Sequence, residues 1–462
     1  MSTILLIYPF FIPRRDRSVF RFPPLGLGYL AASLQRAGHQ VHLLDCTFLD
    51  RESALKQAIA VGADVVGIYS MVTLVENCRW FARRLRQHCR LLVAGGPLPT
   101  CDPLPFLDDF DLVVRGEAEE TLIELITAWE SASSKAGAQW SKVPGLVYRS
   151  QAADRESDAG EVVETAVRPF IRDLDRLAFP ARQMFPNEDY IRFGKKKYGY
   201  SITTVMSTRG CPFHCEFCSN VVFGGSFRQR MAGSVVDEIE EALALGYDRI
   251  AFADDVFTLN RRRVWEVCAE IERRGLRFQW ECLGRVDTLD YPTAVEMKAA
   301  GCTRIYFGIE SGNDHILKLM KKQITTAQAR QAVEAAHRAG LEVGAFFILF
   351  YPGETNETVL DTLRFAASLP LDYLGLTMPY PLPGTELYER TKSRIFRTWQ
   401  PDDSLLWSHV LIYDSEFSET KMWFGILKGH AQFEIGKRFG RAAPLLLKLF
   451  EKPSDVVLRL LK

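Results

Sequence analysis

The sequence contains no run of about 18 or more apolar residues, so we do not expect a membrane-spanning helix. It also lacks an excess of either charge, because Lys+Arg and Asp+Glu both number 57. A nucleic-acid partner would favour a basic stripe, and we therefore expect none. No basic segment precedes the short apolar run Met1–Ile7, which predicts a buried strand rather than a signal peptide. These absences together predict a cytoplasmic protein.

Cysteine is sparse as well, with 10 residues in a chain of 462. In a cytoplasmic chain, this number argues against a disulfide framework and for metal binding or catalysis by a few of the cysteines. The length exceeds that of one ordinary domain, so two or three domains are expected.

Strand and helix signals alternate through residues 1–132, which predicts an α/β domain with a doubly wound, Rossmann-like parallel sheet. The expected strands are Thr3–Tyr8, Gln40–Leu44, Asp64–Tyr69, Leu91–Ala94 and Leu112–Arg115. Residues 133–199 are more polar and are interpreted as an extension of this domain followed by a linker.

A second alternation covers residues 200–394 and predicts a partial, TIM-like (β/α)6 barrel, short of the eight strands of a closed one. Its expected strands are Thr203–Ser207, Arg249–Ala253, Arg277–Leu283, Arg304–Ile309, Glu342–Leu349 and Tyr373–Met378. Residues 395–462 predict a small helical C-terminal domain. Its apolar and basic end, Ala443–Lys462, fits a helix packed on the body or one resting on a membrane surface, and we favour packing.

The strongest motif is the stretch STRGCPFHCEFCSN, residues 207–220, directly after the first expected barrel strand. It presents Cys211, Cys215 and Cys218 with C-x3-C-x2-C spacing. Thiolates are the preferred ligands of iron–sulfur clusters, and three of them would leave one iron of a 4Fe-4S cube open to another molecule. The alternative is a zinc site, which would need a fourth local ligand such as His214.

This motif, at the end of the first strand of a partial barrel, resembles that of the radical S-adenosylmethionine (radical SAM) superfamily. The resemblance implies that S-adenosylmethionine chelates the open iron and is cleaved to methionine and a 5'-deoxyadenosyl radical. It further implies that Phe217 lies near the adenine, and that an electron donor such as flavodoxin or ferredoxin reduces the cluster.

Other residues at expected strand ends fit the same resemblance, because the carboxyl-terminal face is where barrel enzymes place their chemistry. Asp254 and Asp255 would hold the ammonium of the cofactor, Glu310 and Ser311 its ribose or carboxylate, and Arg285 its carboxylate. The segment GAFFILFYPGE, residues 344–354, resembles the strand that packs on the adenine. Each polar residue has an ordinary alternative as a solvated side chain or a helix cap.

The expected strand ends of the first domain carry small and polar residues, which let a large flat ligand approach the backbone. The stretches PPLGLGYLA, GGPLPT and RGEAE resemble the cobalamin-binding domain that precedes many radical SAM enzymes. The resemblance implies cobalamin contacts from Leu25, Gly26, Gly28, Tyr69, Ser70, Met71, Gly95, Gly96, Pro97, Arg115, Gly116 and Glu117. The D-x-H-x-x-G motif that supplies a histidine to cobalt is absent, so no histidine ligand is expected. The alternative is a sheet that has lost its ligand.

The combination implies a methyltransferase acting on an unactivated carbon of a small-molecule, natural-product, lipid or tetrapyrrole substrate. One S-adenosylmethionine would methylate cob(I)alamin, and a second would generate the radical that prepares the substrate to take methyl from methylcobalamin. A radical cyclase or ring-rearranging enzyme without net methyl transfer is the alternative, and an iron–sulfur sensor or binding module is a more distant one. The substrate itself is not predicted.

Overall fold

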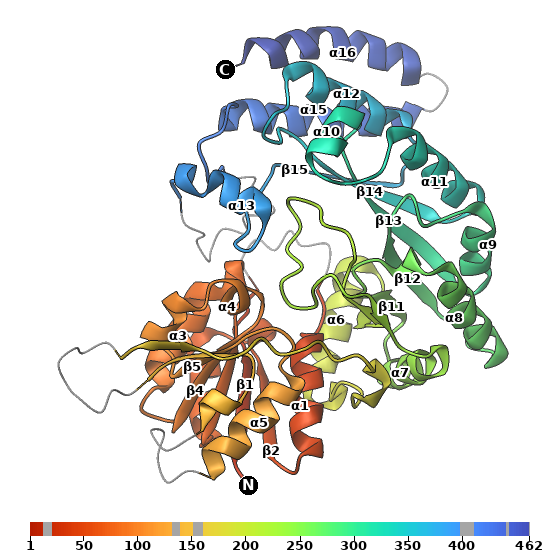
Figure 1. Ribbon diagram of the computed structural model, residues 1–462. Helices are drawn as coiled ribbons and strands as arrows, with labels where there is room; N and C mark the ends of the chain where they lie inside the picture. The colour runs from red at the N-terminus through yellow and green to blue at the C-terminus, as the bar shows by residue number, and fades with distance from the viewer. Residues whose placement is uncertain (13–20, 132–138, 151–159, 398–410, 440–442, 462) are drawn as a thin grey trace.

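The computed structural model describes residues 1–12, 21–131, 139–150, 160–397, 411–439 and 443–461. Two sheets organise the chain, one in the N-terminal part and one in the central part, and helices at the C-terminal end cover one side of the second (Figure 1).

The first sheet has the strand order β2-β1-β3-β4-β5-β6-β7, and its first five strands are parallel. These five are β1 (Thr3–Tyr8), β2 (Gln40–Asp45), β3 (Val65–Tyr69), β4 (Leu91–Gly95) and β5 (Leu112–Val114). Helices cover both faces: α1 (Leu25–Arg36), α2 (Arg51–Ala60), α3 (Val75–Leu85), α4 (Pro97–Cys101) and α5 (Glu119–Glu130). Ile4–Ile7 in β1 are all buried, as expected for a parallel strand with both faces covered. The predicted doubly wound α/β fold is confirmed.

The sheet continues beyond the predicted strands. Antiparallel strands β6 (Leu146–Arg149) and β7 (Val162–Glu164) extend its edge, and helix α6 (Asn187–Tyr198) precedes the barrel. All three elements lie within residues 133–199, which were predicted to form an extension of the first domain followed by a linker.

The second sheet has the order β15-β14-β13-β12-β11-β8, and all its neighbours are parallel. Its strands are β8 (Ile202–Val205), β11 (Arg249–Phe252), β12 (Gln279–Gly284), β13 (Cys302–Glu310), β14 (Glu342–Ile348) and β15 (Tyr373–Thr377). Helices line its outer face: α7 (Ala232–Ala244), α8 (Arg261–Arg273), α9 (Tyr291–Ala299), α11 (Thr326–Arg338) and α12 (Asn356–Ser368). Two short helices, α10 (Asp314–Leu319) and α13 (Glu386–Thr391), follow β13 and β15. The predicted partial barrel of six strands is confirmed.

Helices α15 (Glu419–Phe439) and α16 (Ala443–Leu460) form the C-terminal part, and α15 packs on α12 and β15 while α16 packs on α15. The buried Lys428 of α15 pairs with Asp455 of α16 at 2.9 Å, and Arg364 of α12 pairs with the same carboxylate at 2.5 Å. The packed arrangement that we favoured is therefore observed. In the described ranges, no helix has both the length and the hydropathy needed to span a bilayer.

Candidate active site

The three motif cysteines lie on one tight loop after β8, which we call the cluster loop (residues 211–218). The backbone N–H of Cys211 donates to the carbonyl of Gly224 at 3.2 Å, and that of Cys218 donates to the carbonyl of Cys215 at 3.0 Å. Gly210, immediately before the loop, has φ +84°, and a Cβ there would lie 2.3 Å from a carbonyl oxygen. Only glycine fits this approach to the loop.

The thiols of the cluster loop lie close enough to affect one another's ionisation. Burial first, and then the neighbouring thiols of Cys215 and Cys211, raise the pKa of Cys218 to about 12, so the three groups influence one another. Within the described ranges, no three Cys, His, Asp or Glu side chains converge as they would around one ion. A 4Fe-4S cluster requires less convergence, because its thiolates bind three different irons.

Glu216, inside the loop, fixes it to the far side of the barrel. Its N–H donates to the carbonyl of Met320 at 3.0 Å, and its buried carboxylate accepts from the Tyr351 hydroxyl at 2.6 Å and lies 3.2 Å from Arg390. We did not single out Glu216 from the sequence. An acidic residue between two cluster cysteines was the available signal, but its partners lie more than 100 residues away.

Arg285, predicted as a carboxylate contact, is buried and already bonded. Its guanidinium donates to Asp287 at 3.0 and 3.1 Å and to the carbonyl of Lys322 at 3.0 Å. It also lies over the ring of Phe213 in the cluster loop, 3.4 Å from the centroid. In this structure Arg285 therefore supports the loop through its contact with Phe213.

The two neighbouring aspartates after β11 have different surroundings. Asp254 is 1% exposed, and its carboxylate accepts hydrogen bonds from the N–H of Ser207 at 2.6 Å, from the Ser207 hydroxyl and from the N–H of Thr208 at 3.1 Å. Asp255 is exposed. Asp254 thus holds the segment that leads into the cluster loop. Asp255 lies at the same strand end, where partial burial of its carboxylate and the charge of Asp254 raise its pKa and a hydrogen bond from the backbone of Gly210 lowers it.

Glu310 ends β13 in the left-handed region, with φ +73°, after a register shift between Gly308 and Glu310. Such irregularities are common where a strand end aims a side chain into a site. Its carboxylate accepts from the buried Lys322 ammonium at 3.1 Å. A Cβ on Gly308 would lie 2.5 Å from that carboxylate, so glycine leaves room for the pair.

Lys322 was not predicted. It is buried, its ammonium lies 5.8 Å from the ring of Phe217, and its charge partly offsets the rise that burial causes in the pKa of Cys218. By contrast, the predicted Ser311 is fully buried, and its hydroxyl lies 3.1 Å from that of Thr362 in α12. Lys322 therefore faces the cluster loop, and Ser311 faces away from it.

The end of β14 lies against the predicted adenine residue. Phe217 meets the ring of Tyr351 edge-on, with centroids 6.4 Å apart. Glu354, at the end of the GAFFILFYPGE segment, is 3% exposed, and burial raises its pKa to about 8. Its carboxylate accepts from the N–H of Tyr351 at 2.9 Å, which fixes the turn behind that ring.

A cavity of about 520 Å³ lies at the carboxyl ends of the first sheet. Most of the residues predicted there line it: Leu25, Gly26, Tyr69, Gly95, Gly96, Pro97, Gly116 and Glu117. Gly96 has φ +114°, and a Cβ would lie 2.4 Å from the carbonyl of Ser70, so the wall needs glycine there.

Four predicted residues lie outside this wall: Gly28, Ser70, Met71 and Arg115. Gly28 packs against Phe185 and Pro180, Ser70 is fully buried, and Arg115 pairs with Glu164 at 2.7 Å. These predicted contacts are therefore not part of the cavity wall in this structure.

The barrel also contributes to the wall. Thr204 and Met206, from the end of β8, line the cavity together with Arg209, Val222 and Phe223, which flank the cluster loop. The cavity is therefore shared by the two halves of the chain, and its barrel side is formed in part by residues that flank the cluster loop in sequence.

Known protein families match the two halves of the chain separately. Residues 205–366 match the family model described as the radical SAM superfamily, and residues 15–126 match the B12 binding domain.

Three similar proteins are informative. An uncharacterized methyltransferase of Pyrococcus horikoshii is 34% identical over 79% of this chain and 78% of its own length. The anaerobic magnesium-protoporphyrin IX monomethyl ester cyclase of Cereibacter sphaeroides is 28% identical over 81% of this chain and 61% of its own. The structure of the radical S-adenosylmethionine methyltransferase TsrM from Kitasatospora setae, with cobalamin and a 4Fe-4S cluster bound, superimposes with a TM-score of 0.69. It is 20% identical, over 85% of this chain and 75% of that one.

Proposed function

The chain belongs to the cobalamin-binding radical S-adenosylmethionine enzymes, and from this premise we propose that it transfers a methyl group to an unactivated carbon of a small-molecule substrate. The cofactors of the family are a 4Fe-4S cluster, S-adenosylmethionine and cobalamin. When bound, the cluster and S-adenosylmethionine supply a radical, and cobalamin carries the methyl group.

The observation that carries the proposal is the shared wall of the cavity. Met206 and Arg209, which lead into the cluster loop, line the same cavity as Gly95 and Gly96 at the first sheet. A methyl carrier held there would lie next to the place where the radical forms. Proximity of this kind is what a transfer between two cofactors requires.

We assign roles to residues on the same basis. Cys211, Cys215 and Cys218 would hold the cluster, and the exposed Asp255 would accept hydrogen bonds from the ammonium of S-adenosylmethionine. The Glu310–Lys322 pair offers a carboxylate for ribose hydroxyls and an ammonium for the carboxylate of the same cofactor. A flavodoxin or ferredoxin would supply the electron.

The test uses protein reconstituted with iron and sulfide, supplied with hydroxocobalamin, a reductant, S-adenosylmethionine labelled on its methyl group, and a host extract as the source of substrate. A methyltransferase forms both S-adenosylhomocysteine and 5'-deoxyadenosine, and the label enters a new product. The Cys215→Ala variant is the control for background cleavage. Formation of 5'-deoxyadenosine without any S-adenosylhomocysteine would overturn the proposal of methyl transfer.

Formation of 5'-deoxyadenosine without S-adenosylhomocysteine is the result expected for the other candidate function, a radical cyclase without net methyl transfer. It is favoured by the likeness to the cyclase of Cereibacter sphaeroides over 81% of this chain. The chain spans 61% of that relative, so the comparison does not cover the whole of the cyclase.

A further inference from the structure

Two acidic residues of the cavity wall pair with an arginine that leads into the cluster loop. Arg209, two residues before Cys211, donates to Glu117 at 2.9 Å and to Glu119 at 2.6 Å. All three side chains are less than 8% exposed, and all three line the cavity. The two glutamates belong to the N-terminal half, some 90 residues away in sequence.

Arg228 completes this group, which we call the interdomain ion cluster (Glu117, Glu119, Arg209 and Arg228). It donates to both oxygens of Glu117, at 2.8 and 2.7 Å, and it lies on β10 (Arg228–Gln229), the strand paired with Arg209 on β9 (Thr208–Arg209). Two positive and two negative charges balance. Buried ion pairs are costly when one partner is lost, so the cluster holds its two halves in one arrangement.

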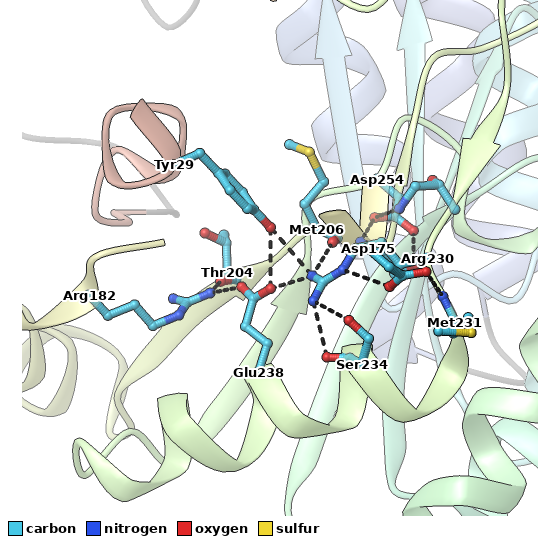
Figure 2. A network of polar contacts seen from close by, with 12 residues as sticks. Tyr29, Asp175, Arg182, Thr204, Met206, Arg230, Met231, Ser234, Glu238 and Asp254 are labelled. Carbon is cyan, nitrogen blue, oxygen red and sulfur yellow. Dashed lines mark hydrogen bonds and ion pairs between the residues drawn. The ribbon is translucent and has the colours of Figure 1, made fainter. Parts of the chain in front are cut away.

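A cavity residue, Tyr29, also contacts a third buried arginine, Arg230 (Figure 2). Tyr29, on α1, donates from its hydroxyl to Glu238 of α7 at 3.2 Å, and Arg230 lies 3.4 Å from the same hydroxyl. Arg230 donates to Glu238, and also to the carbonyl of Met206 at 3.0 Å. The ring of Tyr29 lies under Arg209, 5.1 Å from its guanidinium carbon.

Arg230 and Arg209 therefore connect the cavity wall to the segment of residues 206–209, which runs into the cluster loop. Arg230 holds the start of that segment through Met206, and Arg209 is its last residue. A displacement of the segment would disturb the contacts of Arg209 with Glu117 and Glu119 and of Met206 with Arg230, so the position of the segment and that of the wall are linked through these bonds.

We propose that the interdomain ion cluster and Tyr29 couple the two cofactor sites, so that cobalamin binds more tightly when the iron–sulfur cluster is in place. The proposal rests on the cofactor sites assigned above. Metal held by the three cysteines would restrain the cluster loop and, through it, the position of Arg209, so that its partners Glu117 and Glu119 in the cavity wall would be held in place before cobalamin arrives. The wall then loses less freedom on binding. Coupling is reciprocal, so cobalamin must favour the loaded loop by the same factor.

The experiment measures the dissociation constant of hydroxocobalamin by absorbance titration, in cluster-loaded protein and in protein stripped of iron by a chelator. The ratio of the two constants reports coupling and needs no turnover. For the wild type we expect at least about fivefold tighter binding with the cluster, the lower end of ordinary coupling between sites. Glu119→Gln keeps the shape but removes the charge that faces Arg209, and its ratio should fall towards one.

Glu120→Gln is the matched control. Glu120 is the next residue in the same helix, but it is exposed and contacts Arg168 at 3.4 Å on the surface. Its ratio should equal that of the wild type. If Glu119→Gln does not fold, Tyr29→Phe replaces it, since it removes only the hydroxyl between Glu238 and Arg230 and should lower the ratio as well.

The possible results distinguish failure of the proposed coupling from failure of the assigned cobalamin site. A wild-type ratio of one, or an unchanged ratio in both Glu119→Gln and Tyr29→Phe, overturns the coupling and leaves the cobalamin site standing. No hydroxocobalamin binding in the wild type, with or without the cluster, overturns the assigned site and the coupling together.

Discussion

Asp254 and Asp255 are adjacent carboxylates for which the structure predicts opposite consequences of the same change. Asp254 is buried and bonded to Ser207 and Thr208, directly before the cluster loop, whereas Asp255 is exposed. We expect Asp254→Asn to destabilise the protein and to lower its iron content. We expect Asp255→Asn to leave both unchanged and to weaken binding of S-adenosylmethionine.

The magnitude follows from the bonds that Asp254 accepts. Two backbone N–H groups and one hydroxyl donate to its carboxylate, and an amide would turn these charge-assisted bonds into neutral ones. Such a change costs about 1 kcal/mol per bond. Burial raises the pKa of Asp254, and the hydrogen bonds from Ser207 and the charge of the buried Arg263 oppose that rise; in the Asn variant Arg263 would also lose its counter-charge. Together these losses amount to about 2–4 kcal/mol, a large part of the ~5–15 kcal/mol that stabilises an ordinary protein.

For Asp255→Asn, the lost charge-assisted bond to the ammonium is worth about 1.5–3 kcal/mol, or roughly ten- to a hundredfold in affinity. The assays are the midpoint of denaturant unfolding, the iron content after reconstitution, and titration of the reduced cluster with S-adenosylmethionine followed by EPR. The reasoning is refuted if Asp254→Asn keeps wild-type stability and iron content and loses only affinity for S-adenosylmethionine.

Three further predictions concern other parts of the site. Cys215→Ala should abolish cleavage of S-adenosylmethionine, measured as 5'-deoxyadenosine, while Cys268→Ala, in the buried core, should preserve it; cleavage in the first variant would contradict the assigned cluster ligands. Gly96→Ala should weaken hydroxocobalamin binding by at least about fivefold in an absorbance titration, because its Cβ would lie 2.4 Å from a backbone carbonyl at φ +114°, a strain of about 1–3 kcal/mol; unchanged binding would show that the cavity wall is not the cobalamin site. Burial raises the pKa of Glu354 from its ordinary 4.5 to about 8, so its contribution to the free energy of unfolding is fully present below pH ~4.5 and is lost as the pH rises through about 8, by at most about 5 kcal/mol. Unfolding midpoints measured across this pH range should therefore fall in the wild type, and the fall should be absent in Glu354→Gln. An identical pH dependence in the variant would exclude Glu354 as its source.

The sequence by itself determined the order of the strands along the chain and the class of the fold, and it supplied the cysteine motif from which the cluster ligands are predicted. Buried parallel strands such as Thr3–Tyr8 and Glu342–Ile348 are short apolar runs between helical segments, and this pattern is local. The cysteine motif is equally local, because three ligands within eight residues need only one tight loop. The glycine-rich strand ends likewise placed most of the cavity wall, since the carboxyl ends of parallel strands meet at one edge.

The tertiary structure decided which polar residues face the cofactors and which support them. Asp254 and Asp255 are identical in type and adjacent in sequence, and only the position of Ser207, 47 residues earlier, separates their roles. Ser311 turned towards α12, and Lys322, which no motif marked, came to lie beside Glu310 and Phe217. A side chain's role depends on partners brought near by folding, and the energy of a buried charge depends on those partners far more than on its sequence neighbours.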